Sequence, residues 1–553
     1  MTAQAQSPSP GPSPARRRAH AALPDRVQVA IIGSGLGGLV AAAQLAQAGL
    51  SVAVFEGHYA AGGCATHFSR GPRRAQYHFD VGLHYVGDCG PDGAIPRMLR
   101  EVGVDDVRFR PLDPDGFDRL VFPDLEFRIP ASLDVYRDRL ASAFPHERRG
   151  IDRYVSLLRA VTVASKVIER GGRPPLRDLP ALALAGLRLA PHRESTIAAV
   201  FDAIGVRDRR VRAVMLGQNG DYGLPPQKVS AMLHLGLAAH YFRGAYYPEG
   251  GGQILADKLA ARIEALGGSI HLRHPIEKVL IERGRAVGVK VSPRAGEPAR
   301  DVRADLVLSN ADLKKTLLEL VGPEHLPSDT VRRTRDYEMT SALFMAFLGV
   351  RGELPGMGAH NVWQFDSYDM QDMYRDDPTG PIQTHGCYVT SASYKDPAHA
   401  LHHAPAGVTN VEVMTVVPGS LERFGVSKHD VATWDYRKNE AYRATKQRIE
   451  DDMVARLDRL FPGAAERVVF RESATPVSQV RYTQATDGTP GYGIAATPEQ
   501  FFAKRPGYRT SVPGLYLCGA STRAGHGIVG AMASGRAAAR RILRDQPSLR
   551  ARA

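Results

Sequence analysis

The chain has 553 residues, of which 43% are apolar and 23% are charged. Because a single hydrophobic core stops growing beyond about 250–300 residues, we expect two domains of ordinary soluble composition. The formal charge of +13 includes arginines gathered at 16–18 and 540–552, and elsewhere basic and acidic residues are interspersed. This distribution argues against a nucleic-acid partner. It leaves open a solvated arginine-rich surface or attraction to an anionic membrane surface.

Residues 1–25, rich in Pro, Ser and Gly, predict a disordered tail, and residues 546–553 predict a flexible one. The first tail lacks the apolar segment of a secretory signal. Pro180–Leu189 is apolar, but it is interrupted by Arg188 and is shorter than the roughly 20 residues of a spanning helix. The four cysteines are scattered without metal-ligand spacing. We therefore expect a cytoplasmic protein, peripheral to a membrane at most, without a metal site.

The segment that begins at Val27 has the order strand, glycine turn, helix. Val27–Ile32 is typical of a buried parallel strand, and Leu39–Ala48 is typical of a helix. Between them lies a GxGxxG turn, whose expected cofactor-binding residues are Gly33, Gly35, Leu36 and Gly38. The first glycine permits the tight turn, the second lets a pyrophosphate approach the backbone, and the third lets the helix pack on the strand.

A second strand, Ser51–Phe55, ends in Glu56, and a carboxylate there accepts hydrogen bonds from the ribose of an adenine dinucleotide. A glycine turn alone would be weak evidence. Strand, turn, helix, strand and acid in this order predict a Rossmann-type dinucleotide-binding fold. The motif does not separate FAD from NAD.

A glycine pair, Gly62 and Gly63, follows Glu56 and is itself followed by Cys64. An acid followed by a glycine pair at this spacing resembles the flavoprotein group of amine oxidases and phytoene desaturases. The resemblance implies that the pair lies against the dinucleotide phosphates. Many members of that group carry Arg after the pair. Cys64 removes this phosphate contact, as it does in retinol saturases.

A second glycine turn lies near the other end of the chain. Leu515–Cys518 predicts a strand, and Ala531–Ile542 predicts a helix. The turn between them suits the flavin and its ribityl chain, and its expected cofactor-binding residues are Gly519, Ala520, Gly527, Ile528 and Val529. NAD enzymes need only the first turn, so the two turns together favour FAD. Ala520 replaces an acid that often stands there in the flavoprotein group, so no side-chain bond to the ribityl chain is expected.

A third segment, Tyr246–Val291, predicts a helix followed by strands, and Ala304–Asp312 predicts another buried strand. It resembles the family segment that returns to the nucleotide domain and contacts adenine through the backbone near Ile276. The expected FAD-binding domain therefore comprises residues 26–100, 246–312 and 501–545. The expected substrate domain comprises residues 101–245 and 313–500.

Several segments are similar to retinol saturases: EGHYAAGGC, FDVGLHYVGD, HYFRGAYYPEGGG, HNVWQFDSYDMQD and SASYKDP. TPVSQVRYTQATDGTPGYGI is also similar to carotenoid isomerases, and AGHGIVGA is closer to bacterial carotenoid desaturases. The resemblance implies an α/β fold: a Rossmann-type FAD-binding domain built from discontinuous segments plus an α+β substrate-binding domain. It also implies a hydrophobic polyene or isoprenoid substrate. The electron partner, whether oxygen, quinone or nicotinamide, stays open.

The candidate catalytic residues are His84 and Tyr85, which follow a segment that passes beside the flavin in the wider group, and His526 in the second turn. His84 or Tyr85 is the preferred proton donor, with flavin hydrogen bonding or core packing as the alternative. We expect the substrate to contact side chains near glycine-rich segments: Tyr247, Tyr492 and Arg523. The flavin itself would supply the hydride chemistry.

A lipid entry near Leu179–Leu189 is a further hypothesis, with arginines around its mouth at Arg173, Arg177, Arg188 and Arg193. Ordinary core packing is the alternative. Three functions stay open: a saturase or desaturase, a redox-neutral cis–trans isomerase using reduced FAD, and a flavin-free prenyl-binding protein of the Rab escort type. The two intact glycine turns argue against the last. An amine oxidase is disfavoured, because no aromatic cage is visible around Trp363 and Trp434.

Overall fold

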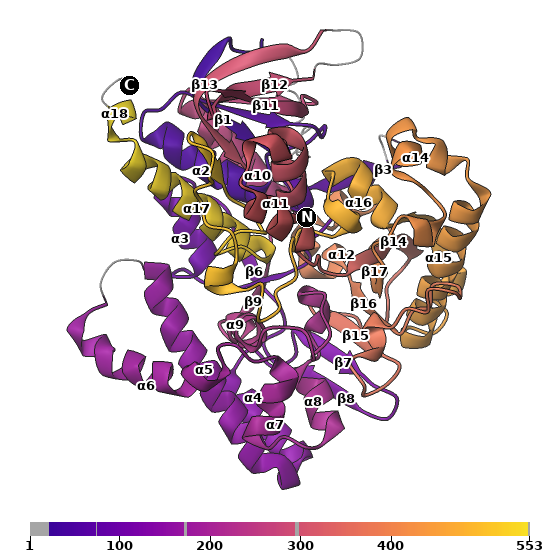
Figure 1. Ribbon diagram of the computed structural model, residues 1–553. Coiled ribbons are helices and arrows are strands. Elements are labelled where there is room, and N and C mark those ends of the chain that lie inside the picture. Colours follow the sequence, from indigo (N-terminus) through magenta and orange to yellow (C-terminus); the bar gives the residue numbers. More distant parts are fainter. Residues whose placement is uncertain (1–21, 73–74, 171–173, 293–297, 551–553) are drawn as a thin grey trace, which may run out of the picture.

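The first of two large sheets carries the predicted nucleotide-binding strands. The computed structural model describes residues 22–72, 75–170, 174–292 and 298–550 (Figure 1). The strand order is β10 (Ser269–Leu272), β2 (Val52–Glu56), β1 (Arg26–Ile32), β13 (Arg300–Ser309), β12 (Arg285–Val291) and β11 (Ile276–Glu282), with β19 (Leu515–Leu517) beside β13. β10, β2, β1, β13 and β19 are parallel, whereas β12 pairs antiparallel with both of its neighbours, β13 and β11. Three distant stretches of the chain thus share one sheet.

Three helices cover one face of this sheet close together: α2 (Leu36–Gln47), α10 (Gln253–Ala265) and α17 (Gly527–Asp545), with α3 (Ala94–Glu101) beside them. Glycine allows the close approach, because a Cβ at Gly38 would collide with the carbonyl oxygen of Gly33, and one at Gly535 with the backbone of Gly37. This is the helix–strand packing that the third glycine of the first turn predicts.

Both helices after a glycine turn begin earlier than expected. α2 begins at Leu36 rather than Leu39, and α17 begins at Gly527 rather than Ala531. Gly38 and Gly530 therefore belong to the first helical turn, where close neighbours leave no room for a side chain. As a result, both helix N-termini lie nearer the glycine turns than the sequence predicted.

The second large sheet belongs to the remainder of the chain. Its order is β18 (Val468–Ala474), β14 (Ala342–Arg351), β17 (Val408–Val417), β16 (Gly386–Thr390), β15 (Asn361–Phe365), β7 (Asp118–Val121) and β8 (Glu126–Ile129). The long helix α15 (Glu440–Leu460) packs on β14, β17 and β16. The shorter helices α12 (Ala392–Lys395) and α13 (Ala400–His403) contact β17, and α16 (Pro476–Thr483) contacts β14, β18 and α14 (Lys428–Thr433). The helix α11 (Ser328–Asp336) packs on the segment 315–321.

Two small sheets connect these parts. The ribbon of β3 (His67–Arg70) and β4 (Tyr77–Asp80) follows the predicted glycine pair. A three-stranded sheet joins β5 (Val86–Gly87), β9 (Ala245–Pro248) and β6 (Phe109–Pro111). Its strands come from both sides of the expected domain boundaries at 100 and 245. Strands of the expected FAD-binding domain therefore pair with a strand of the expected substrate domain.

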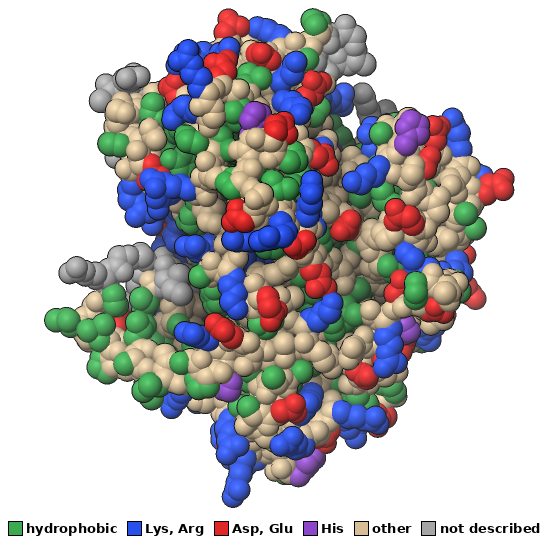
Figure 2. Space-filling model, in the orientation of Figure 1, with side chains coloured by type: hydrophobic (Ala, Val, Ile, Leu, Met, Phe, Trp, Pro, Cys, Tyr) green, Lys and Arg blue, Asp and Glu red, His purple; other side chains and the backbone are tan. Residues whose placement is uncertain are grey.

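A helical lobe lies below the sheets in Figure 1. It comprises α4 (Leu133–Ala143), α5 (Arg148–Arg170), α6 (Leu179–Leu189), α7 (Ile197–Ile204), α8 (Arg209–Met215) and α9 (Ala231–Tyr241). α5 packs against α4, α6, α7 and α9. α6 projects from the body on α5 and leaves most of its apolar side chains exposed (Figure 2). In the part of the chain that the structure describes, no helix combines the length and apolar character needed to cross a bilayer.

The expected flexible tail after residue 545 is wrong in part. Residues Pro547–Arg550 form the short helix α18, and Leu549 is buried against the first sheet's core. The carbonyl oxygen of Leu549 accepts a hydrogen bond from the side chain of Gln28 at 3.1 Å. One apolar anchor therefore orders a segment whose composition suggested none. Most of the expected disordered tail, residues 1–21, lies outside the described residues.

Candidate active site

A single cavity of about 1490 Å³ runs between the two large sheets. One end is lined by residues at the carboxyl ends of β1, β2 and β13: Gly33, Glu56 and Asn310. In sheets of this kind the carboxyl ends of the parallel strands form the ligand crevice. The cavity then passes both glycine turns and continues into the helical lobe.

Glu56 is held in place at the dinucleotide end of the cavity. Its Oε2 accepts hydrogen bonds from the backbone N–H and the hydroxyl of Ser34 at 2.8 and 2.7 Å, and its Oε1 accepts one from the N–H of His58 at 2.8 Å. Ile276 lines the same region of the cavity. A carboxylate fixed at the end of β2 fits the ribose of an adenine dinucleotide.

The predicted glycine pair lies directly against the first turn. The N–H of Gly62 donates to the carbonyl of Ser34 at 2.9 Å, and a Cβ at Gly63 would lie 3.1 Å from the Cα of Gly35. Gly62 and Gly63 have positive φ angles of 126° and 59°. The neighbouring Cys64 also lines the cavity, and burial raises the pKa of its thiol, so it stays uncharged beside the cofactor region.

The two distant glycine turns meet around Asn310, a residue that the sequence analysis missed. A Cβ at Gly35 would lie 2.8 Å from its side-chain Nδ2, and a Cβ at Gly519 would lie 2.9 Å from its Oδ1. Asn310 also lines the cavity. Its position directly after the buried strand β13 is the sequence signal that could have identified it, because ligand-binding residues gather at such strand ends.

Two helix N-termini face the same cavity. Gly35, Leu36 and Gly37 at the start of α2 line it, and so do Gly527, Ile528 and Val529 at the start of α17. The first N–H groups of a helix lack intrahelical partners and favour negatively charged or carbonyl oxygen. Gly519 and Ala520 line the cavity between them. With Glu56 at one end, the α2 N-terminus beside it and the α17 N-terminus farther along, these residues fit an extended FAD.

Tyr85 lies at the centre of a buried acidic cluster on the cavity wall. Its hydroxyl is 2.8 Å from Asp221 Oδ2 and 3.2 Å from Asp118 Oδ2. The hydroxyl of Tyr241 donates to the same Asp221 oxygen at 2.9 Å. A tyrosine has one hydroxyl proton, so both contacts of Tyr85 are hydrogen bonds only when one of the carboxyl groups carries a proton.

The environment of the two carboxyl groups favours such a proton. Burial raises the pKa of Asp118 to about 6, against the opposing effect of hydrogen bonds from Asn361 and Gln218. Burial, followed by the charge of Asp118, raises the pKa of Asp221 to about 7. Two neighbouring buried carboxylates cannot both ionise freely. Tyr85, Asp221 and Asp118 thus form a hydrogen-bonded cluster in which one carboxyl group can carry a proton. Tyr85 and Asp221 line the cavity.

His84 points to a different acid. Its Nδ1 lies 2.7 Å from Oε2 of Glu412 on β17, and Glu412 is almost fully buried. His84 lines the cavity, and its backbone carbonyl accepts a hydrogen bond from the buried Lys395. The sequence predicted neither Glu412 nor Lys395 here. Glu412 therefore fixes the His84 ring on the cavity wall. Its role as the proton donor stays a prediction.

His526 and Tyr492 are stacked in the second turn, with ring centroids 4.9 Å apart and an interplanar angle of 18°. His526 Nε2 lies 3.2 Å from the backbone oxygen of Asp221. Burial lowers the pKa of His526 to about 3, so the ring is neutral and is a poor proton donor at neutral pH. Both rings line the cavity next to the α17 N-terminus. The contact to Asp221 brings the acidic cluster close to the expected flavin position.

Two predicted substrate contacts are corrected by the structure. Tyr247 is fully buried behind the cavity wall, where its hydroxyl donates to Asp80, and it does not line the cavity. Arg523 is exposed to solvent and does not line the cavity either. Both residues are close in sequence to the glycine segments, but neighbouring residues of a turn or strand point to opposite sides.

The far end of the cavity is apolar and reaches α6. It is lined by side chains from α5, α6 and α9: Val161, Ala164, Leu189, Met232, Leu233 and Leu237. Leu189 is the last residue of the exposed apolar helix. Of the arginines expected around a lipid entry here, Arg188 and Arg193 are exposed close in sequence to Leu189, and Arg177 is exposed before the other end of α6. Arg173 lies outside the described residues.

Comparisons with known proteins agree with this geometry. The model of the family described as flavin containing amine oxidoreductase matches residues 36–399 and 430–543. An all-trans-retinol 13,14-reductase of Danio rerio is 25% identical, with 90% of this chain and 83% of the relative covered. A chloroplastic prolycopene isomerase 1 of an Oncidium hybrid cultivar is 25% identical, with 93% and 83% covered.

Among solved structures, an oxidoreductase from Methanosarcina mazei matches with a TM-score of 0.58 and 21% identity, covering 92% of this chain and 99% of that one. The predicted fold class is confirmed, as is the resemblance to retinol saturases and carotenoid isomerases. The family model covers most of the chain. The protein therefore belongs to the flavin-containing amine oxidoreductase family, and its cofactor is FAD.

Proposed function

We propose that this flavoprotein transfers hydride between FAD and a carbon–carbon bond of a hydrophobic polyene or isoprenoid, as a saturase or desaturase. The observation that carries the proposal is the continuous cavity, whose apolar lobe extends from the glycine turns to Leu189. A polyene needs a long apolar channel, whereas a small amine does not. The names of the relatives, a retinol reductase and a prolycopene isomerase, support the same substrate class.

FAD, when bound, accepts or donates hydride, and the chain supplies binding, orientation and protons. Glu56 and the two helix N-termini would hold the cofactor, and the apolar walls would exclude water. Saturating a carbon–carbon double bond takes up one hydride and one proton. Tyr85 Oη would give its proton to the substrate carbon and regain one from the Asp221 carboxyl, with Asp118 sharing the charge that remains. In a desaturation the same groups would accept the proton.

A redox-neutral cis–trans isomerase using reduced FAD is the second candidate, favoured by the prolycopene isomerase relative. The decisive experiment incubates the yellow purified protein, with its FAD oxidised or reduced under anaerobic conditions, with a panel of retinoids, carotenoids and amines. A product that has gained or lost two hydrogens supports the saturase or desaturase. Unchanged mass with altered double-bond geometry supports the isomerase. Turnover of amines alone overturns both.

We also propose that α6 contacts a membrane surface and admits the substrate from it. Four exposed leucines lie on α6 and the turn before it: Leu176, Leu179, Leu184 and Leu187. Figure 2 shows apolar side chains along this projecting helix, and Arg177 and Arg188 are exposed among them. An apolar helix with basic neighbours favours the interface of an anionic bilayer. The cavity reaches the end of this helix at Leu189, which supports entry at this point.

A further inference from the structure

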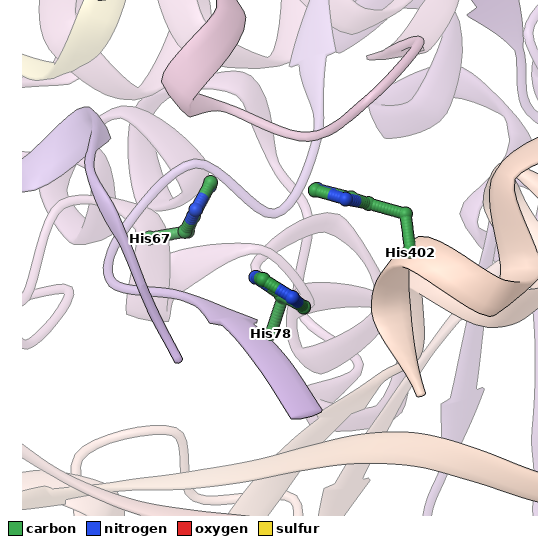
Figure 3. A group of neighbouring side chains, drawn as sticks. All are labelled: His67, His78 and His402. Atoms are coloured by element: carbon green, nitrogen blue, oxygen red, sulfur yellow. The ribbon is translucent and has the colours of Figure 1, made fainter. Parts of the chain in front are cut away.

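Three histidines from two distant parts of the chain converge next to the cofactor region. His67 lies on β3, His78 on the paired strand β4, and His402 on α13 (Figure 3). In the β3–β4 ribbon, His67 is opposite Asp80 and Ser69 is opposite His78. His67 and His78 are therefore diagonal neighbours on one face of the ribbon. His402 approaches that face from the second large sheet's side.

The three rings are close enough to share one ion. One ligand atom from each histidine lies within 4.8 Å of the other two. The ring centroids of His67 and His78 are 5.3 Å apart, those of His67 and His402 are 5.7 Å apart, and those of His78 and His402 are 4.5 Å apart. Figure 3 shows the rings gathered around a common space. Ligands at ~2.0–2.1 Å from Zn²⁺ lie roughly 3.3 Å from one another, so shifts of about 1 Å would close the site.

The electrostatic surroundings suit a cation bound by neutral imidazoles. A neutral imidazole keeps a lone pair on one ring nitrogen and is the form in which histidine binds a metal ion. The hydroxyl of Ser69 lies 2.9 Å from Nδ1 of His78 and holds that ring in place. Asp396, which is fully buried, acts on His402 as the nearby negative charge. Such outer groups orient ligands and balance the charge of an ion.

We propose that His67, His78 and His402 bind one divalent transition-metal ion of the zinc class, at a site separate from the flavin. Three imidazoles suit Zn²⁺ and leave a fourth position for water, whereas Mg²⁺ and Ca²⁺ prefer oxygen ligands. The ion fastens the β3–β4 ribbon to α13. Because His67 also lines the cavity, the ion stands at the cavity wall. The proposal does not depend on the reaction or the substrate.

The test uses the tag-free, full-length flavoprotein, stripped with a chelator and titrated calorimetrically with Zn²⁺. We expect one Zn²⁺ per chain, and we expect His402→Gln and His78→Gln each to weaken binding by about 10- to 100-fold. The control is His146→Gln, since His146 is an exposed histidine of the helical lobe that pairs with Asp208 and is not part of the trio. This control should bind Zn²⁺ as the wild type does.

A second measurement keeps the test decisive if a variant fails to retain FAD or to fold. Co²⁺ added to the wild-type protein should give the visible d–d absorption of a nitrogen-ligated ion, and Zn²⁺ but not Mg²⁺ should abolish it. Wild-type protein without saturable Zn²⁺ binding, or well-folded His402→Gln and His78→Gln variants with unchanged affinity, would overturn the proposal.

Discussion

Tyr85 links the two buried carboxyl groups to the cavity, and the proposed protonation of the substrate uses its hydroxyl. We predict that Tyr85→Phe lowers kcat by about 100-fold or more while FAD content stays unchanged, because general acid–base groups contribute at this level. Steady-state turnover of the polyene identified by the panel checks this. Tyr154→Phe is the control, since Tyr154 bonds His234 at 2.8 Å in the core, outside the cavity. Full turnover by Tyr85→Phe would exclude it as the donor.

Asp221 gives stability a pH dependence that needs no substrate to measure. Its pKa is raised from the ordinary 3.8 to about 7 by burial and by Asp118, so the folded protein binds this proton more tightly than the unfolded chain does. Stability contributed by this group is therefore lost as pH rises from about 4 to about 7. Asp221→Asn removes the titration. As pH rises across this window, the free energy of unfolding of the variant should increase relative to that of the wild type, by at most ~4 kcal/mol.

Thermal melts at closely spaced pH values check that prediction. Asp105→Asn, which changes an exposed carboxylate, should melt in parallel with the wild type at every pH. If Asp221→Asn does the same, the carboxyl pair does not hold the proton that the proposed mechanism requires.

Glu56 is the one predicted cofactor-binding residue with a negatively charged side chain, so replacing its carboxylate by an amide tests that charge. Glu56→Gln puts an amide N–H toward a backbone or hydroxyl donor, because Ser34 and His58 both donate to the carboxylate. We expect FAD to bind about tenfold more weakly, which corresponds to ~1.4 kcal/mol. Fluorescence titration of the apoprotein with FAD measures it. Glu282→Gln, on the exposed edge of β11, should leave FAD affinity unchanged.

The helix α6 is the element whose exposure the proposed membrane contact explains. Leu184 and Leu187 are 49% and 74% exposed, and burial of such side chains at an interface is worth roughly 1 kcal/mol or more apiece. Leu184→Asp with Leu187→Asp should abolish co-sedimentation with anionic liposomes. Val135→Asp, which charges an apolar position on α4 that is 45% exposed, is the control. Wild-type protein that binds neither neutral nor anionic liposomes would exclude membrane contact by α6.

The N-termini of α2 and α17 line the same cavity although the two helices are far apart in the sequence. α2 and α17 belong to segments nearly 500 residues apart in the chain, yet both N-termini line one cavity. The strand, turn and helix of each motif could be predicted because hydrophobic period and glycine spacing are local signals. That both ends open on the same space follows from the pairing of β19 with β13 and of β13 with β1.

On the scale of the whole molecule, Asn310 lies where the stretches around β1, β13 and β19 meet. We predict that Asn310→Ala weakens FAD binding by about tenfold, because both glycine turns lose the side chain between them. Asn439→Ala is the control: it removes the N-cap hydrogen bond of α15 at 2.9 Å and should cost about 1 kcal/mol of stability without changing FAD affinity. Equal FAD affinity in the wild type and Asn310→Ala would show that the turns hold their geometry independently.

The dinucleotide-binding motif, the second glycine turn and the strands and helices next to them could be predicted from the sequence. Each of these is encoded within about 30 neighbouring residues, where backbone geometry restricts which residues are allowed. The sequence also indicated His84, Tyr85 and His526 as candidate catalytic residues; all three line the cavity, and their catalytic role stays a prediction. It misplaced Tyr247 and Arg523, since closeness along the chain does not fix the side to which a side chain points.

The groups that surround those residues could not be predicted from the sequence, because they come from other parts of the folded chain. Asp118 and Asp221 reach Tyr85, Glu412 reaches His84, and His402 reaches the β3–β4 ribbon across 33 to more than 300 residues of chain. A lone buried acid or histidine has no periodic signal, because its partner is supplied by packing between sheets rather than by its neighbours. The cluster of Tyr85, Asp118 and Asp221 and the histidine trio therefore form through tertiary contacts. These contacts set both the burial of each side chain and the charges beside it.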